Sequence, residues 1–494
     1  MARLSVVNLS SLTGKAQLPT FDPANHKVGI VHLGIGAFHR AHQAWYTHKL
    51  LEQQGGDWRI RGVSLRTAGV RDTLNPQDGL YTVAVKSSEG TEHHIIGAVE
   101  SVLVAPENPA AVIDSLCEEN VHVVSLTITE KGYCLTNSTG ELDPSHESIV
   151  HDLGHLESPQ SALGFLIAAC RRRMQTAMPG LTIMSCDNLA GNGAKLEAAM
   201  TDFAALVDPA LKLWLKDNVT FPSTMVDRIV PATTPENKAA VAAAIGVEDQ
   251  ACVMAEPFTQ WVVEEKFAGP VPDWAKVGAT FVADVEPFED MKLRILNAAH
   301  STIAYVGCLA GYPTVAEAVA DSALRQLIDH MMANELAPTL QMPDGFDTDA
   351  YAKSLLERFT NRGLPHKTRQ IAMDGSQKIP QRMLPALRHQ LNQGGSIDGL
   401  TLGIASWIRY CEGVEENGDR YAVDDPMAPL FQRINAETQG DVSARLESFL
   451  ALRDVFDQTL ASNNTLRKKL LFWLTELSEK GVRAVLAERI VPRL

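Results

Sequence analysis

The chain has 494 residues, which is enough for two or three domains with sizeable cores. Apolar residues make up 45% of it and charged residues 21%, the composition of an ordinary globular protein. With 44 basic and 59 acidic residues the formal net charge is −15, which argues against nucleic acid or an anionic membrane surface as a partner.

The first half of the chain alternates short apolar runs, rich in β-branched residues, with longer helical windows. This alternation is typical of βαβ units around a mostly parallel sheet. The expected strands are residues 27–33, 59–65, 122–129, 181–186, 225–230, 252–257 and 280–284. The expected helices between them are residues 37–53, 109–118, 161–176 and 194–216.

From about residue 287 onward the strand pattern stops, and helical windows are separated by turns rich in Gly, Pro, Asn and Asp. The expected helices are residues 289–309, 315–333, 348–360, 380–392, 400–411, 427–436, 442–456 and 466–488. We therefore predict an α/β protein: a doubly wound sheet in residues 1–284, then a mostly α-helical substrate-binding and catalytic domain in residues 285–494. A small substrate is normally enclosed in a cleft between domains, so we expect the active site there.

The seven cysteines are widely spaced and form no C-x-x-C pair. They therefore suggest reduced thiols rather than a disulfide framework or a zinc site. The sequence contains no window as long as a membrane span and no signal-like apolar segment. We expect a cytoplasmic protein with no membrane partner.

A glycine-rich turn follows the first expected strand. It comprises Gly34, Ile35, Gly36, Ala37, Phe38, His39 and Arg40. Two glycines let the turn tighten and the backbone approach a pyrophosphate, whose charge then meets a helix N-terminus. His39 replaces the third glycine of the fingerprint, and many bare G-x-G matches are ordinary turns. Because this one lies between a strand and a helix, we predict a Rossmann-like dinucleotide-binding domain, with His39 and Arg40 near the phosphates.

The second expected strand ends at Ser64-Leu65-Arg66-Thr67, without the carboxylate that would bind the ribose hydroxyls of NAD. Arg66 could meet the 2′-phosphate of NADP, or it could cover the adenine. The choice between NAD and NADP is therefore open on these residues. No metal is expected, because His32, His39 and His42 have no matching carboxylate or thiolate framework; His32 is interpreted as a hydrogen-bonded strand histidine.

The stretch Lys292-Leu293-Arg294-Ile295-Leu296-Asn297-Ala298-Ala299-His300 places an amine, an amide and an imidazole on an apolar helical segment. At about 100° per residue, Asn297 lies roughly 140° around from Lys292, with His300 between them at roughly 80°. The three polar heads can therefore converge. Burial of a lysine lowers its pKa towards a value suited to a general base. The alternative is an amphipathic helix whose polar residues face solvent.

Other distinctive stretches occur along the chain in a fixed order. They are residues 125–133 (SLTITEKGY), 185–188 (SCDN), 224–228 (TMVDR) and 374–380 (DGSQKIP). Together with the glycine-rich turn and the lysine stretch, they resemble the long-chain mannitol dehydrogenase family of polyol and uronate oxidoreductases. The resemblance covers essentially the whole chain, and it suggests a monomer.

The resemblance implies hydride transfer between a nicotinamide and a secondary alcohol. This reaction needs a proton donor and acceptor, and it needs hydrogen-bond donors for the oxyanion. Lys292 matches the family's catalytic lysine, and Asn188 and Asn297 match its paired amides. His300 would orient the substrate or hydrogen-bond the lysine.

Substrate contacts are implied in the same way. Asp227 matches a substrate-side aspartate, although a salt bridge to Arg228 is an equally good interpretation. Lys378 is expected in a Gly/Ser loop, where it would contact substrate hydroxyls. A uronate carboxylate would need a cation, for which arginine gives the best bidentate geometry. Arg382 is the first candidate and Arg369 the second, and either could instead be a solvated surface arginine.

Within the family, residues 221–231, 370–382 and 407–414 most resemble the branch that interconverts D-fructuronate and D-mannonate. The leading hypothesis is this reaction, with NAD as cofactor and NADP not excluded. The alternative is oxidation of a neutral polyol such as D-mannitol at C2. A more remote alternative is a non-catalytic nucleotide sensor; a sensor, however, needs no proton-transfer lysine.

Overall fold

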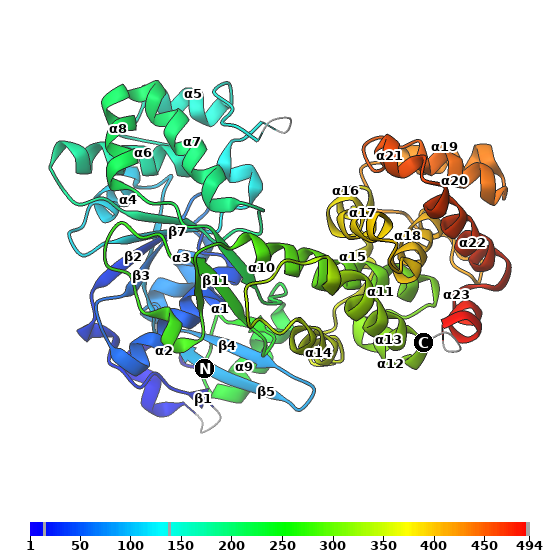
Figure 1. Ribbon diagram of the computed structural model, residues 1–494. Coiled ribbons are helices and arrows are strands. Elements are labelled where there is room, and N and C mark those ends of the chain that lie inside the picture. Colours follow the sequence, from blue (N-terminus) through cyan, green and yellow to red (C-terminus); the bar gives the residue numbers. More distant parts are fainter. Residues whose placement is uncertain (13–15, 137–139, 491–494) are drawn as a thin grey trace. The chain divides into compact units, whose positions relative to one another are not determined.

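The computed structural model describes residues 1–12, 16–136 and 140–490 (Figure 1). The chain divides into two compact units, Met1–Glu286 and Pro287–Leu494. The first unit combines three sheets with helices, and the second is built from helices. The predicted α/β class, a parallel sheet followed by a helical region, is therefore confirmed. Among the residues described, no helix has both the length and the apolar character needed to cross a membrane.

The main sheet of the first unit has five parallel strands in the order β6-β3-β2-β7-β8. These strands are β2 (Val28–Leu33), β3 (Arg59–Ser64), β6 (Val99–Val104), β7 (Val123–Leu126) and β8 (Thr182–Ser185). All six residues of β2 are buried. Val31 and Leu33 belong to one core cluster and Ile30 to the other, so both faces of the sheet are covered, as in doubly wound folds.

Helices supply the two covers. One core cluster contains residues of α4 (Pro109–Leu116), α6 (Ala162–Gln175) and α7 (Asn192–Val207), and the other contains residues of α2 (Gln43–Gln54). The predicted helix 37–53 is in fact two helices, α1 (Ala37–Ala41) and α2, because the backbone of His42 leaves the helical region at φ −122° and ψ −88°. The predicted helix 194–216 is likewise divided into α7 and α8 (Pro209–Asn218), with extended Asp208 as the N-cap before Pro209.

Two smaller mixed sheets complete the first unit. Their strands are β1 (Ala16–Gln17), β5 (Thr91–Ile96), β4 (Tyr81–Lys86) and β10 (Val253–Ala255) in one, and β12 (Thr280–Val282), β11 (Gln260–Glu264) and β9 (Thr224–Asp227) in the other. The prediction missed β1, β4, β5, β6 and β11. It also missed three helices, α3 (Gly69–Leu74), α5 (Glu147–Gly154) and α9 (Pro235–Ile245).

The second unit is organised around α11 (Ala298–Leu309), all of whose residues are buried. α11 packs against α18 (Asp398–Tyr410) and α15 (Thr368–Ala372), and α18 packs against α22 (Asn464–Lys480). The remaining helices are α10 (Glu286–Met291), α12 (Val315–Ala320), α13 (Ser322–His330), α14 (Thr348–Phe359), α16 (Gly375–Arg382), α17 (Leu384–Gln393), α19 (Ala428–Thr438), α20 (Val442–Leu450), α21 (Gln458–Ala461) and α23 (Val482–Val485). The predicted helix 315–333 is interrupted at Asp321, which caps α13 through its carboxylate.

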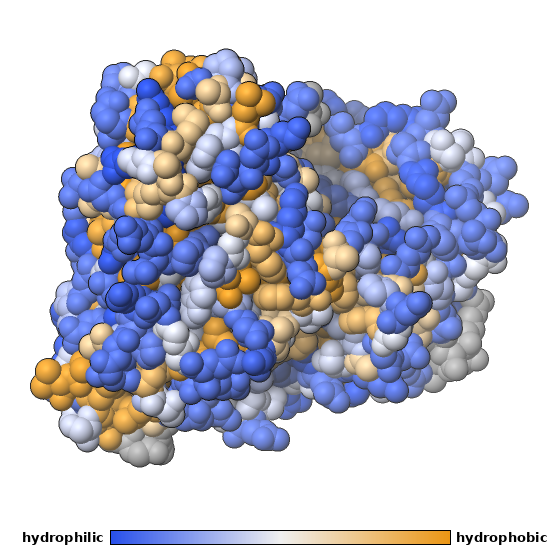
Figure 2. Space-filling model, turned by 60° about the vertical axis from the view of Figure 1, so that its left-hand side comes forward, coloured by the Kyte–Doolittle hydropathy of each residue, from blue (hydrophilic) through white to orange (hydrophobic). Residues whose placement is uncertain are grey.

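The face shown in Figure 2 is mostly hydrophilic, with single apolar side chains and small groups of them among the polar ones. Among the residues that the structure describes, the exposed large apolar ones are Met1, Val6, Val7, Leu18, Val150, Leu153, Leu206, Leu213 and Leu471. Apolar side chains scattered in this way are normal on a folded protein.

Candidate active site

The glycine-rich turn leaves the carboxyl end of β2. Gly34 has φ +93°, and a Cβ built on it would lie 2.1 Å from the carbonyl oxygen of Thr127, so only glycine fits there. Gly36 is the N-cap of α1, and a Cβ at this position would meet nothing closer than the Gly34 oxygen at 3.9 Å. The backbone at Gly36 therefore borders open space, which fits the approach of a pyrophosphate.

The side chains of His39 and Arg40, which follow the turn, are packed inside the first unit. The His39 ring stacks on His32 with 3.3 Å between centroids, and Arg40 donates to the carbonyl oxygens of Gly36 (3.3 Å) and Ala251. These side chains are held within the unit, and their place near the cofactor phosphates stays a prediction. The backbone of residues 34–38 remains as the part of the motif that could approach a phosphate.

Other side chains of the motif are structural as well. Ile35 is buried in the core, and Ala37 and Phe38 pack partly buried against it. His32 is confirmed as a hydrogen-bonded strand histidine, with Nδ1 2.7 Å from Ser125 Oγ and Nε2 2.8 Å from Thr127 Oγ1. Arg66 is exposed just beyond β3, a position compatible with either role proposed for it.

A buried carboxylate that the sequence analysis did not single out, Asp187, follows β8. It accepts hydrogen bonds from the backbone N–H groups of Ile128 and Thr129, both at 2.9 Å, and from Tyr133 Oη at 2.7 Å. Burial raises the pKa of Asp187, and these bonds oppose the rise. Thr129 has φ +65° and ψ 162°, a region that normally requires glycine. Asp187 thus holds a strained loop at the carboxyl edge of the sheet, next to exposed Asn188.

Asp227 is the last residue of β9 and is buried. Its neighbour Arg228 donates from Nε to the carbonyl oxygen of Glu256 at 3.0 Å and from Nη1 to that of Ala41 at 2.5 Å. Burial lowers the pKa of Arg228 to about 10. The guanidinium of Arg228 is thus anchored by backbone carbonyls.

The sequence predicts a regular α-helix for the lysine stretch of the second unit. The structure differs from this prediction. Lys292–Asn297 forms a π-helical turn between α10 and α11. Its hydrogen bonds join residues five apart, so Lys292 and Asn297 relate much as i and i+4 do in an α-helix, about 40° apart rather than 140°. Lys292 is only 9% exposed, and His300, about two turns further along, is also buried. The turn therefore brings the amine and the amide onto one face.

Lys378 was predicted in a loop, and this prediction is wrong, because Lys378 lies within α16. The start of α16 is stabilised by Asp425, whose carboxylate accepts from Ser376 N (2.8 Å) and Ser376 Oγ (2.6 Å). Gly375 is needed for packing, since a Cβ there would lie 2.4 Å from Trp407 Nε1. The Gly-Ser pair thus begins a helix that the sequence pattern did not indicate.

The two candidate arginines have different surroundings. Arg382 donates from Nη1 to Ser301 Oγ at 3.2 Å and makes a longer contact of 3.5 Å with the carbonyl oxygen of Asn297. Arg369 is exposed, forms an ion pair with Glu415 and lies 4.2 Å from the ring centroid of Tyr421. Arg382 therefore lies beside the lysine stretch, whereas Arg369 is already paired elsewhere.

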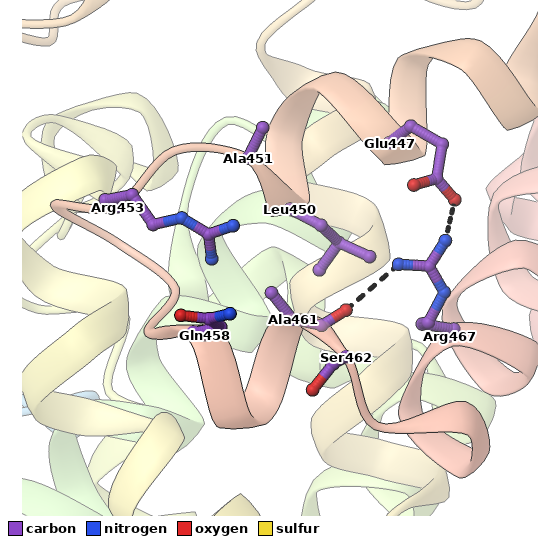
Figure 3. Close-up of a pocket in the computed structure, with 8 residues that line it drawn as sticks. All are labelled: Glu447, Leu450, Ala451, Arg453, Gln458, Ala461, Ser462 and Arg467. Carbon is purple, nitrogen blue, oxygen red and sulfur yellow. Dashed lines mark hydrogen bonds and ion pairs between the residues drawn. The ribbon is translucent and has the colours of Figure 1, made fainter.

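A surface pocket of about 230 Å³ opens among α20, α21 and α22 (Figure 3). Its Arg467 is bound by Glu447 and by the carbonyl oxygen of Ala461 at 3.0 Å. No residue singled out from the sequence lines it. The lining residues are Glu447, Leu450, Ala451, Arg453, Gln458, Ala461, Ser462 and Arg467. Among the described residues, no group of three His, Cys, Asp or Glu side chains is arranged to hold a metal ion.

A parallel sheet with a glycine turn at its carboxyl edge, followed by a helical unit with a buried lysine, is the architecture of a nucleotide-dependent oxidoreductase. Comparison with known protein families shows to which family of oxidoreductases the chain belongs. Residues 28–276 match the mannitol dehydrogenase Rossmann domain, and residues 284–477 match the mannitol dehydrogenase C-terminal domain. The chain belongs to the mannitol dehydrogenase family of oxidoreductases.

Individual relatives resemble the chain over most of its length. The D-mannonate oxidoreductase of Escherichia coli strain K12 is 46% identical over 474 residues, which cover 95% of this chain and 97% of the relative. A mannitol 2-dehydrogenase of Phaeosphaeria nodorum is 39% identical, covering 98% of this chain and 85% of the relative. The Pseudomonas fluorescens mannitol 2-dehydrogenase, solved as a ternary complex with NAD and D-mannitol, is 35% identical, with a TM-score of 0.83 and full coverage of both chains.

Proposed function

We propose that this chain interconverts D-fructuronate and D-mannonate with NAD as cofactor. The observation that carries the proposal is the cationic group of Arg382, which lies 3.5 Å from the carbonyl oxygen of Asn297 and donates to Ser301 Oγ at 3.2 Å. The carboxylate of a uronate needs such a group, whereas a neutral polyol does not. The 46% identity with a D-mannonate oxidoreductase supports the same choice.

Lys292 is the proposed acid and base. In reduction its ammonium donates a proton to the C5 carbonyl oxygen as negative charge develops there, and in oxidation the neutral amine takes the proton back. The Asn297 amide, on the same face of the π-helical turn, donates a hydrogen bond to that oxygen and stabilises it. Asn188, which follows β8, keeps the role of the second amide donor expected from the sequence, and Asp227, the last residue of β9, keeps its expected substrate-side role.

The backbone of residues 34–38 would hold the pyrophosphate of the dinucleotide, with the open space at Gly36 allowing close approach. Arg66 would contact the adenosine end. When bound, the nicotinamide supplies or accepts the hydride. NAD is preferred over NADP because the Pseudomonas fluorescens relative was solved with NAD.

The proposal is tested by initial rates of NADH and NADPH oxidation with D-fructuronate and with D-fructose. We expect the highest kcat/KM with NADH and D-fructuronate. Arg382→Ala should raise KM for D-fructuronate roughly 10- to 100-fold, because a hydrogen bond to a charged group is lost. Its KM for D-fructose should change little. A clear preference for D-fructose in the unaltered enzyme would defeat the uronate proposal.

The second candidate is oxidation of D-mannitol to D-fructose. The two mannitol 2-dehydrogenases that resemble this chain, at 39% and 35% identity, favour it. The same substrate panel separates the two functions. Neutral substrates would then be turned over without any contribution from Arg382.

A further inference from the structure

A second histidine, His366, lies beside His300 in the helical unit. The two ring centroids are 5.3 Å apart and the ring planes are perpendicular, at 90°. His366 comes from the segment between α14 and α15, whereas His300 belongs to α11. Phe359, the last residue of α14, contacts the His300 ring with 4.7 Å between centroids. Three elements thus fix the positions of the two imidazoles.

Both imidazoles carry a buried nitrogen with no protein partner. Within the described parts of the chain, neither His300 Nε2 nor His366 Nδ1 forms a hydrogen bond. An unpaired buried polar atom costs about 1–3 kcal/mol, so a ligand that hydrogen-bonds these two nitrogens would recover part of that free energy. In the tautomer that places the ring proton on these atoms, each can donate a hydrogen bond to an acceptor oxygen of a ligand.

The charges that bear on the two rings are positive. Arg358 and Arg382 act on His300, in addition to His366, while Arg358 and Lys378 act on His366. Burial, as the larger cause, and these charges, as the smaller one, hold the pKa of His300 well below its usual value. The same two causes lower the pKa of His366 to about 4. A bound carboxylate would counter this repulsion. The basic character is local, because the whole chain carries a formal charge of −15.

The group also lies next to the residues proposed for catalysis. Arg382 contacts the backbone of Asn297 and the hydroxyl of Ser301, one residue beyond His300. The C1 carboxylate and the reacting C5 of a six-carbon sugar acid are separated by three carbon atoms. One substrate molecule therefore has to present its charge close to the atoms at which it reacts.

We propose that His366 is a specificity-determining residue, which donates a hydrogen bond to the substrate carboxylate alongside Arg382 and so favours sugar acids over the matching neutral polyols. This inference rests on the proposed function, since it assigns the anionic end of that substrate. It adds a residue from outside the sequence motifs by which the family was recognised.

D-mannonate and D-mannitol are the matched probes for the test. They share the same carbon chain and stereocentres and differ only in the carboxylate or hydroxymethyl group at C1. Inhibition constants for both are measured against NADH-dependent ketose reduction. In His366→Ala we expect the constant for D-mannonate to rise roughly 10- to 100-fold and that for D-mannitol to stay within about twofold. Lys367→Ala is the control, because it removes an exposed cation from the next position in the chain and should change neither constant.

Equal weakening of both inhibitors, or no weakening of either, would overturn the role of His366. If His366→Ala does not fold, the same comparison is made with His366→Gln, which should lose at least about threefold of the preference for D-mannonate. Failure of the proposed function looks different: the unaltered enzyme would reduce D-fructose and not D-fructuronate. The two inhibitors would then be compared against D-fructose reduction, and the inference stands only if D-mannonate still binds more tightly through His366.

Discussion

Replacing His32 by glutamine should flatten the pH dependence of stability. His32 is fully buried between Ser125 and Thr127, and burial lowers its pKa from 6.5 to about 3. The native protein therefore does not bind this proton until about pH 3, whereas the unfolded chain binds it below pH 6.5. Because the unfolded state holds more protons in this window, stability falls as the pH falls from 6.5 towards 3.

The magnitude follows from the width of the window. A pH of about 5 is roughly 1.5 units below the pKa of this histidine in the unfolded chain, and each pH unit changes the free energy of unfolding by about 1.36 kcal/mol. His32 alone therefore lowers the free energy of unfolding by about 2 kcal/mol at this pH. Glutamine does not titrate, and it can still donate to and accept from the two hydroxyl groups. The loss of unfolding free energy between pH 7.5 and 5 should therefore be about 2 kcal/mol smaller in His32→Gln than in the unaltered chain.

Urea unfolding of the full chain at the two pH values measures this difference. His155→Gln is the control, because the side chain of His155 is exposed and hydrated in both states. An identical pH dependence in His32→Gln and the unaltered protein would refute the linkage. A pH-independent loss of stability would assign His32 a packing role only.

Four further substitutions test the site. Lys292→Ala should lower kcat about 10²–10⁴-fold at neutral pH, measured with the preferred ketose, and a near-normal kcat would exclude this amine as the proton donor. Gly34→Ala should lower the free energy of unfolding by at least about 2 kcal/mol, because its Cβ would collide with the Thr127 carbonyl. Gly36→Ala should keep the urea midpoint of the unaltered protein and weaken NADH binding. Equal urea midpoints for the two variants would contradict this expectation. Asp187→Asn should cost about 2–4 kcal/mol in urea unfolding, since an amide cannot accept all three hydrogen bonds, and an unchanged midpoint would show that the loop does not depend on the carboxylate.

Local signals predicted β2, β3, β7 and β8 of the main sheet but missed β6. β2 is a continuous apolar run followed by Gly34, and both features are visible in the sequence. β5 was missed because its sequence, TEHHII, begins with two exposed polar residues and includes two histidines. Its strand conformation depends on the antiparallel pairing with β4, a contact that no window of β5 reveals.

Side-chain networks were harder to predict than elements. Asp187 lies in a motif that attracted attention for Asn188, yet its partners are about 55 residues earlier in the chain, at Ile128, Thr129 and Tyr133. His366 lies in no motif at all and gains significance only because α11 brings His300 to it. Chemical type can be predicted from sequence, but convergence of residues far apart in the chain requires the fold.

The π-helical turn shows both the chemical type that the sequence predicts and the side-chain geometry that only the fold reveals. The composition of the lysine stretch suggested a catalytic group, but α-helical geometry set Lys292 and Asn297 roughly 140° apart and left only a long, bent lysine arm to join them. Widening the turn from four residues to five aligns the pair directly, at the cost of poorer backbone hydrogen bonding. π-helical turns are rare and frequently occur at functional sites. A buried lysine and an amide aligned by such a turn are hard to explain as helix packing alone, because a regular α-helix would have packed Ile295 and Leu296 at a lower cost.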